Sequence, residues 1–384
     1  MSGSTSTGAV AAPLFQPLSV RSLHLPNRTV MAPMGRMFAV DGVPSPEAAA
    51  YYRRRAEGEV GLVITEATGV DHPLSADHPG VPVMYGDEAI AAWKVIVDEV
   101  HAAGGRIIPQ LFHQGMLRGG GLADGTVPSL RPSGTIGVPG RTSYSPKFIE
   151  EASSPTTPMT DSDIQDVIDA FSRSARTAVA LGFDGIAIHG AHGYIIDSFL
   201  WGESNTRTDS YGGDHRARTA LAVEVIKAVR EATGPDLPVF FRFSQHKSSN
   251  YDARIAETPQ ELEQILGPIA DAGIDVIDAS MRRFYQPAFE GSDLNLAGWA
   301  KKLTGKPAVV VGSIGLNNSA TETFLKEDSA AADNIPQLIE RFGTGEFDLV
   351  SIGRSLIGDS HFVSKLRAGR PFTPFHRGLL DTLV

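Results

Sequence analysis

The chain has 384 residues, no cysteine and a formal net charge of -10 at pH 7. The lack of cysteine excludes disulfides, cysteine nucleophiles, thiolate zinc sites and cysteine-ligated iron–sulfur clusters. The acidic balance argues against a general binder of nucleic acid or of anionic membranes.

Residues 1–13 are rich in serine, threonine, glycine and alanine. They lack the basic and apolar regions of a secretion signal, and no apolar run in the chain approaches the roughly 18 residues of a membrane span. We therefore predict a flexible tail on a cytoplasmic protein, followed by one domain over residues 14–384.

Short apolar runs alternate with amphipathic segments through this domain. Runs that are apolar at consecutive positions are typical of parallel strands buried on both faces. The runs lie at residues 28–33, 61–68, 106–113, 185–192, 238–244, 275–280, 308–315 and 348–354. The helical segments lie at residues 46–58, 87–104, 161–182, 216–234, 259–273, 294–304, 320–342 and 356–369.

Eight strands, each followed by a helix, predict an α/β protein with the (β/α)8 architecture of a TIM barrel. Residues 116–158, after the third run, have little helical periodicity, which predicts an insertion that caps the barrel mouth. A doubly wound open sheet is the alternative topology. However, no G-x-G-x-x-G motif follows the first run, where a Rossmann domain would need it.

The turns after the seventh and eighth runs predict a phosphate site. They contain Gly312-Ser313 and Gly353-Arg354. Glycines admit an anion close to backbone N–H groups, and the arginine can add a charged contact. Tight turns without a ligand are the structural alternative.

The fourth run ends in His189-Gly190-Ala191-His192-Gly193-Tyr194. Imidazole N–H groups can hold a carbonyl oxygen on which charge develops, and a tyrosine hydroxyl can deliver a proton. A zinc site is disfavoured because no helical H-E-x-x-H pattern and no third ligand are evident. Histidines with a purely structural role are the other alternative.

Two strand residues could also contact a ligand. Arg242 lies in an otherwise apolar run and needs an acceptor, which could be a ligand or an internal carboxylate such as Glu66. Gln110 can read the donor–acceptor edge of a heterocycle or satisfy a backbone group.

A pair of arginines follows the sixth run. Arg282 and Arg283 could meet an anionic group of a substrate or of NADPH. The favoured interpretation is that they pair with local acids such as Glu290 or Asp293.

Five segments carry a family resemblance: residues 27–34, 51–56, 110–113, 189–194 and 205–213. In this order they resemble the Old Yellow Enzyme family of FMN-dependent ene-reductases, and the match runs from Phe15 to Leu366. The resemblance implies a TIM barrel with FMN at its mouth. The residues it assigns to FMN are Pro33, Met34, Gly35, Ala67, Gln110, Arg242, Gly312, Ser313, Gly353 and Arg354.

The resemblance also implies the chemistry. His189 and His192 would bind the carbonyl or nitro oxygen of a small enone-type substrate. Tyr194 would protonate Cα while the hydride of flavin N5 reaches Cβ. NADPH or NADH would reduce the flavin first in the same pocket, which explains how the enzyme can lack a Rossmann motif. The resemblance implies no metal.

The chain departs from the family at Gly35 and in residues 213–216, a segment about two residues shorter than the family's usual link. Gly35 stands where the family usually has threonine or cysteine near the flavin C4 carbonyl, so a side-chain hydrogen bond is missing. An aromatic ring of residues 371–375 could approach the flavin or belong to a packed surface tail. With no cysteine ligands, the chain should also lack the iron–sulfur cluster of the larger relatives.

Two alternatives remain at this stage. A phosphate-binding lyase or isomerase would need a Schiff-base lysine or a carboxylate base, and the eight runs contain no lysine. A non-catalytic flavin-binding protein would not need His189, His192 and Tyr194 together. The sequence leaves open the oligomeric state, including a homo-oligomer, and the choice of reductant.

Overall fold

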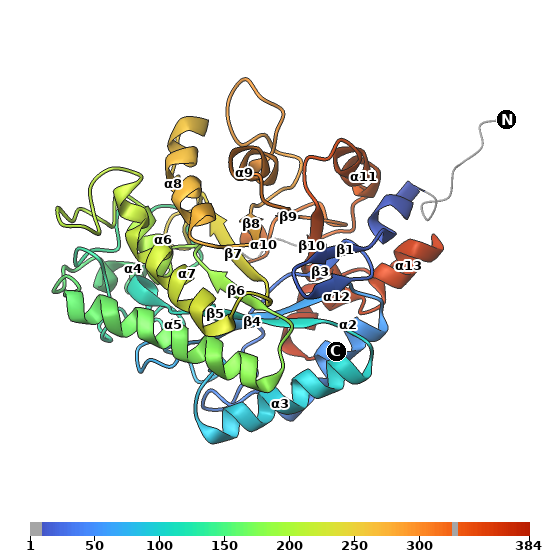
Figure 1. Ribbon diagram of the computed structural model, residues 1–384, viewed down its shortest axis with the longest axis horizontal. Coiled ribbons are helices and arrows are strands. Elements are labelled where there is room, and N and C mark those ends of the chain that lie inside the picture. The colour runs from blue at the N-terminus through green and yellow to red at the C-terminus, as the bar shows by residue number, and fades with distance from the viewer. Residues whose placement is uncertain (1–9, 325–328) are drawn as a thin grey trace.

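A closed barrel of eight parallel strands forms the centre of the protein (Figure 1). The computed structural model describes residues 10–324 and 329–384. The strands are β3 (Thr29–Met31), β4 (Leu62–Gly69), β5 (Ile107–Phe112), β6 (Ile186–His189), β7 (Val239–Ser244), β8 (Val276–Ser280), β9 (Ala308–Val311) and β10 (Leu349–Ile352). Pairing of β10 with β3 closes the ring. The predicted TIM barrel is therefore confirmed.

Helices surround the barrel, as in other (β/α)8 proteins. The helices of this ring are α2 (Pro46–Glu57), α3 (Asp87–Ala102), α5 (Asp161–Leu181), α7 (Ala220–Thr233), α8 (Pro259–Asp271) and α9 (Leu296–Thr304). Capping boxes at Thr160 and Thr258 begin α5 and α8, because each threonine accepts the N3 amide and the N3 carboxylate accepts the threonine amide.

Two predicted helices are wrong as continuous elements. The segment 320–342 contains α10 (Ala320–Phe324) and α11 (Ile335–Gly343), and its residues 325–328 lie outside the described part of the chain. Asn334 interrupts it, because its side chain bonds the Gly315 amide and the Ser313 carbonyl instead of continuing a helix. The segment 356–369 divides into α12 (Arg354–Gly358) and α13 (Phe362–Ala368) at Asp359.

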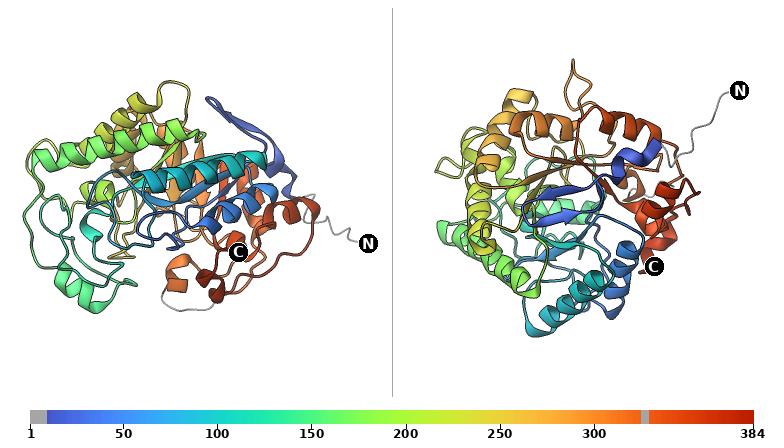
Figure 2. Two further views of the ribbon diagram at one scale, coloured as in Figure 1. Left: turned by 90° about the horizontal axis from the view of Figure 1, so that it is seen from below. Right: turned by 45° about the vertical axis from the view of Figure 1, so that its right-hand side comes forward.

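A hairpin that the sequence did not predict closes the amino end of the barrel. Its strands are β1 (Leu18–Val20) and β2 (Leu23–Leu25), and its leucines pack with the inward-facing strand residues. The turn is fixed by the Ser22 amide, which donates to the Asp236 carbonyl at 3.1 Å, just before β7. Figure 2 shows the hairpin lying across the middle of the helical ring.

The N-terminal boundary also differs from the prediction. Residues 1–9 of the predicted tail lie outside the described part of the chain. The 3-10 helix η1 (Ala12–Phe15) follows directly, and both Ala11 and Leu14 are buried. Ala11 is buried in the core and Val10 packs against it, whereas Ala12 and Pro13 are exposed, so the packed part of the chain begins before residue 14.

The segment after β5 lies at the carboxyl ends of the strands. It contains the short helix α4 (Pro146–Ala152). It is bonded to the chain after β7, because the Tyr251 amide donates to the Arg141 carbonyl at 2.7 Å and the Gly140 amide donates to the Ser249 carbonyl at 3.0 Å. The insertion is therefore held over one side of the barrel mouth.

Candidate functional site

A cavity of about 490 Å³ opens at the carboxyl ends of the strands. It brings together every residue that the sequence assigned to FMN or to catalysis. They are Pro33, Met34, Gly35, Ala67, Gln110, His189, His192, Tyr194, Arg242, Gly312, Ser313, Gly353 and Arg354. An outer hollow of about 540 Å³, lined by residues within 41–43 and 76–89, contains none of them.

A strained turn after β6 presents the two histidines and the tyrosine. His192 and Gly193 both have positive φ, 66° and 86°, a conformation that only glycine adopts without cost. The turn is held by the carboxylate of Asp197, which accepts the Gly193 amide at 2.6 Å. Lys247 in turn lies 2.7 Å from Asp197, and both side chains are fully buried. This buried ion pair fixes the turn and thus the direction of the side chains.

The two histidines of the turn are neutral hydrogen-bond donors. Burial, followed by the charge of Arg242, lowers the pKa of His189 to about 3. Its Nδ1 accepts the Ala191 amide at 3.3 Å, so the ring proton lies on Nε2. Burial also lowers the pKa of His192, whose Nε2 lies 2.7 Å from the Ser280 hydroxyl. An oxygen atom in the cavity would meet uncharged imidazoles.

Tyr194 keeps its proton at neutral pH. Burial, followed by the charge of Asp77, raises the pKa of its hydroxyl to about 12. Tyr144 of the insertion hydrogen-bonds to Tyr194 and offsets part of this rise. The ring packs edge-on against His189, with centroids 4.9 Å apart. Tyr194 is therefore placed as a proton donor beside an imidazole donor.

Two buried nitrogen donors in the cavity lack a partner among the described residues. Arg242 Nε donates to Asp278 of the neighbouring strand at 2.7 Å, while its Nη2 has no partner. The Nε2 of Gln110 has none either. Since buried polar groups are normally satisfied, these two atoms indicate a ligand with an acceptor edge. The internal partner of Arg242 is Asp278; the suggestion of Glu66 was wrong.

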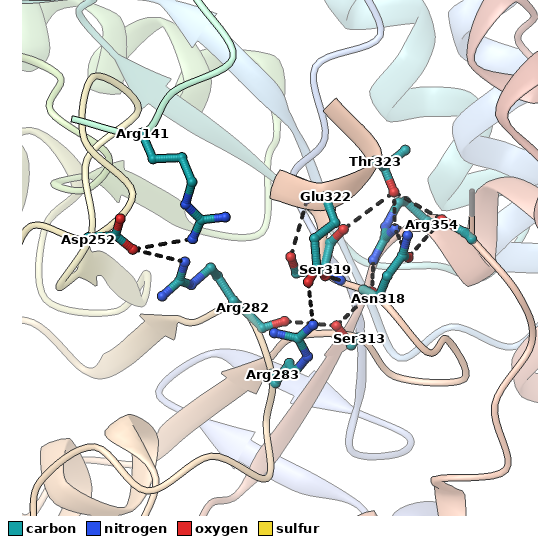
Figure 3. A network of polar contacts seen from close by, with 11 residues as sticks. Arg141, Asp252, Arg282, Arg283, Ser313, Asn318, Ser319, Glu322, Thr323 and Arg354 are labelled. Atoms are coloured by element: carbon teal, nitrogen blue, oxygen red, sulfur yellow. Dashed lines mark hydrogen bonds and ion pairs between the residues drawn. The ribbon is translucent and has the colours of Figure 1, made fainter. Parts of the chain in front are cut away.

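Arg354 is enclosed by the segment that follows β9 (Figure 3). Its Nη1 donates to the side chains of Asn318, Thr323 and Ser329, and its Nη2 donates to the Asn318 carbonyl at 2.6 Å. Burial lowers its pKa to about 10, so the guanidinium stays charged at neutral pH. Arg354 thus contributes its positive charge to this end of the cavity, with its Nη atoms already hydrogen-bonded.

The two arginines after β8, Arg282 and Arg283, form ion pairs with carboxylates other than Glu290 and Asp293. Arg283 pairs with Glu322 at 2.5 Å, and Arg282 lies 3.7 Å from Asp252. Pairing with Glu290 or Asp293 was wrong, because the side chains turn toward α10 and the loop after β7. Arg282 lines the cavity.

Glu66 of β4 adds a buried carboxyl to the cavity wall, and burial raises its pKa from 4.5 to about 7. Its charged form accepts the Arg36 amide at 2.7 Å, which offsets only part of this effect. Because the folded pKa exceeds the unfolded one, the protonated carboxyl stabilises the fold below pH 4.5, and this stabilisation is lost as pH rises toward 7. The loss should be on the order of 3 kcal/mol.

The variant Glu66→Gln, which imitates the protonated carboxyl, should flatten the dependence of unfolding free energy on pH in this window. Urea unfolding at a series of pH values measures it. An unchanged pH dependence in the variant would assign it to other groups.

Sequence reasoning missed several cavity residues, among them Asp77, Tyr144, His246 and Tyr251. Asp278 could have been predicted, because it is a carboxylate within an apolar run. It lies in register with Arg242 on the neighbouring strand. The others come from loops, where the sequence has no periodicity that fixes direction. Of the C-terminal aromatics, the ring of Phe372 stacks on that of Phe362 with centroids 4.1 Å apart. Phe375 packs with Leu316 and Ile357, which line the cavity, and its ring centroid lies 5.9 Å from the Arg354 guanidinium.

Within the described residues, no group of three histidine or carboxylate side chains gathers as a metal site requires. None of the helices in those same parts of the chain has the length and apolar character of a membrane crossing.

A model of the NADH:flavin oxidoreductase / NADH oxidase family matches residues 13–373. The chain is 38% identical over 232 residues to 12-oxophytodienoate reductase 1 of Oryza sativa subsp. japonica, covering 59% of this chain and 57% of the rice protein. It is 30% identical over 370 residues to an NADH oxidase of Thermoanaerobacter brockii, covering 93% of this chain and 51% of that protein. The chain thus spans little more than half the length of these curated relatives.

A solved structure with the same fold is that of an Old Yellow Enzyme from a Pichia species. The two chains superpose with a TM-score of 0.74 at 27% identity, covering 96% of this chain and 90% of the Pichia chain. The likeness therefore extends over the barrel and its surrounding segments.

Proposed function

The chain belongs to the NADH:flavin oxidoreductase / NADH oxidase family, that of Old Yellow Enzyme, and we propose that it is an FMN-dependent NAD(P)H oxidoreductase acting as an ene-reductase. Its substrates are electron-poor C=C bonds of α,β-unsaturated carbonyl or nitro compounds. The observation that carries this proposal is one cavity that contains two neutral imidazoles, a protonated tyrosine and two unpartnered nitrogen donors.

The residues present fit FMN. The Nη2 of Arg242 and the Nε2 of Gln110 would meet the acceptors of the flavin's pyrimidine edge. Pro33, Met34, Gly35 and Ala67 would line the ring system, while Gly312, Ser313, Gly353 and Arg354 would hold the phosphate. When bound, FMN takes up a hydride from NADPH or NADH and gives it to the acceptor.

The chain's own groups prepare the acceptor for this transfer. His189 Nε2–H donates to the carbonyl or nitro oxygen, and His192 faces the same oxygen. Because both rings are neutral, with His189 buried and His192 half-buried in the cavity wall, their donors are fixed and poorly screened, which strengthens the polarisation of the C=C bond. Tyr194 then supplies the proton to Cα. Reductant and acceptor occupy the cavity in turn.

The variant Tyr194→Phe tests this assignment. It should slow oxidation of the reduced enzyme by 2-cyclohexenone on the order of 100-fold, because it removes the proton donor but keeps the ring packing. Reduction by NADPH should stay within about twofold, since that half-reaction needs no proton from Tyr194. Stopped-flow absorbance of each half-reaction measures both rates. Equal losses in both would rule out the proton-donor role.

A second variant, Gly35→Thr, tests the departure at the flavin. A Cβ at Gly35 would meet no other heavy atom within 4 Å, so the side chain can be accommodated. Its hydroxyl would add a hydrogen bond near the flavin C4 carbonyl, and we expect a shifted flavin potential and a changed rate of reduction by NAD(P)H. A spectroelectrochemical titration measures the potential. An unaltered potential would contradict the expectation.

A further inference from the structure

A second tyrosine lies beside the proton donor Tyr194, and the proposed mechanism leaves it unused. Tyr144 of the insertion lines the same cavity as Tyr194, and both side chains are half-buried. Their hydroxyls hydrogen-bond to each other, and neither has a further hydrogen-bond partner among the described residues. A tyrosine hydroxyl has one proton to donate and lone pairs that accept, so one of the two can donate to the other and leave that second proton free.

The hydrogen bond between the two tyrosines runs from Tyr144 to Tyr194. Desolvation raises the pKa of both hydroxyls, and the negative charge of Asp77 adds to the rise in each. Their mutual hydrogen bond raises the pKa of Tyr144 further but lowers that of Tyr194. A donor holds its proton more tightly, whereas the anion of an acceptor is stabilised. Tyr144 is therefore the donor, and the proton of Tyr194 stays available to a ligand in the cavity.

Contacts with the chain after β7 fix the position of Tyr144 at the cavity. The Thr142 hydroxyl donates to the Ser248 carbonyl at 2.5 Å and accepts the Tyr144 amide at 3.1 Å. The Ser248 amide in turn donates to the His192 carbonyl at 2.9 Å. The segment that carries Tyr144 is thus tied to the turn that carries Tyr194.

Packing also restricts the ring of Tyr144. It lies against the ring of Phe148 in α4, with centroids 4.9 Å apart, and Phe148 is fully buried. The backbone of Gly120 approaches the ring as well, because a Cβ at this glycine would lie 2.6 Å from the ring atom Cε1. The hydroxyl of Tyr144 is therefore oriented before a ligand enters the cavity, as a preorganised donor requires.

We propose that Tyr144 is a positioning residue for proton transfer: its hydroxyl holds the Tyr194 oxygen in place and stabilises the tyrosinate that forms when the acceptor substrate is protonated. In this step the O–H bond of Tyr194 breaks as the C–H bond at Cα forms, and the electron pair stays on the oxygen. Water returns the proton after the product has left. The charge of Asp77 disfavours a second negative charge nearby, and a fixed donor on the Tyr194 oxygen offsets this cost. The inference rests on the proposed function, because it takes Tyr194 as the proton donor.

The test compares two oxidants of the FMN-loaded, NADPH-reduced protein by stopped-flow absorbance. 2-Cyclohexenone needs a proton at Cα, whereas ferricyanide takes up electrons and forms no C–H bond. Tyr144→Phe should slow oxidation by the enone about tenfold, because a hydrogen bond to a developing charge is lost while the ring packing remains. Oxidation by ferricyanide and reduction by NADPH should each stay within about twofold of the wild-type rates, since neither uses the proton of Tyr194.

Two further variants separate this role from a structural one. The matched control is Tyr251→Phe, which removes a hydroxyl that belongs to the same cavity but bonds to Ser143 at 2.6 Å. It should leave oxidation by the enone within about twofold, because Tyr144 keeps its bond to Tyr194. In the Tyr194→Phe background, adding Tyr144→Phe should cost less than about twofold, since no tyrosinate forms there.

The other outcomes overturn the role of Tyr144. They are an unchanged enone rate in Tyr144→Phe, an equal loss with ferricyanide, an equal loss in Tyr251→Phe, or a full additional loss in the Tyr194→Phe background. If the wild-type protein binds no FMN or its reduced form is not oxidised by the enone, the proposed function itself fails. Normal enone reduction with an unaffected Tyr144→Phe removes the role of Tyr144 alone.

Discussion

The Lys247→Met variant should unfold about 3–5 kcal/mol more easily than the wild-type protein. The Lys247 ammonium lies 2.8 Å from Asp197 Oδ1 and 2.7 Å from Oδ2, and neither side chain is exposed. Removing the cation leaves a carboxylate buried without compensation. Urea unfolding followed by circular dichroism gives the free-energy difference.

The double variant Lys247→Met/Asp197→Leu is the control for this prediction. Because both charges are gone, it should recover a large part of the lost stability. A single variant as stable as the wild type would show that the pair is not a structural support of the turn at Gly193. Loss of phenol binding in a folded single variant would show that the pair also orients the histidines.

His189→Ala and His192→Ala should each lower the rate of enone reduction about 100- to 1000-fold, because a donor fixed in a buried site is removed. Phenol charge-transfer binding should weaken in parallel. Steady-state turnover with 2-cyclohexenone and phenol titration measure the two effects.

The variant His189→Asn, which restores an N–H donor, is the matched control and should regain part of the loss. Reduction by NADPH reports on folding. If it falls as much as enone turnover, the substitutions disturb the cavity in general and the oxygen-binding role is not supported.

The barrel was predictable because its strands bury both faces. Runs such as residues 61–68 and 238–244 are apolar at successive positions, a pattern typical of strands covered on both sides of a parallel sheet. The site could be located for the same reason, since the carboxyl ends of parallel strands meet at one mouth. Arg242 and Gln110 were visible as polar residues within those runs.

The two helices that were wrongly predicted as continuous are interrupted where a side chain makes hydrogen bonds in place of the helical backbone. Asn334 bonds Gly315 and Ser313, and Asp359 accepts the Thr373 amide, so each ends a helix that periodicity alone would continue. The loop residues of the cavity are a second case. Tyr144 and His246 reach it through contacts between segments far apart in sequence, which no local pattern encodes.

The most direct test of the proposed function is the visible spectrum of the purified protein, recorded without oxygen while NADPH and then 2-cyclohexenone are added. We expect a yellow protein that bleaches with NADPH and regains its colour with the enone. A colourless protein that cannot be reconstituted with FMN would contradict the proposed function.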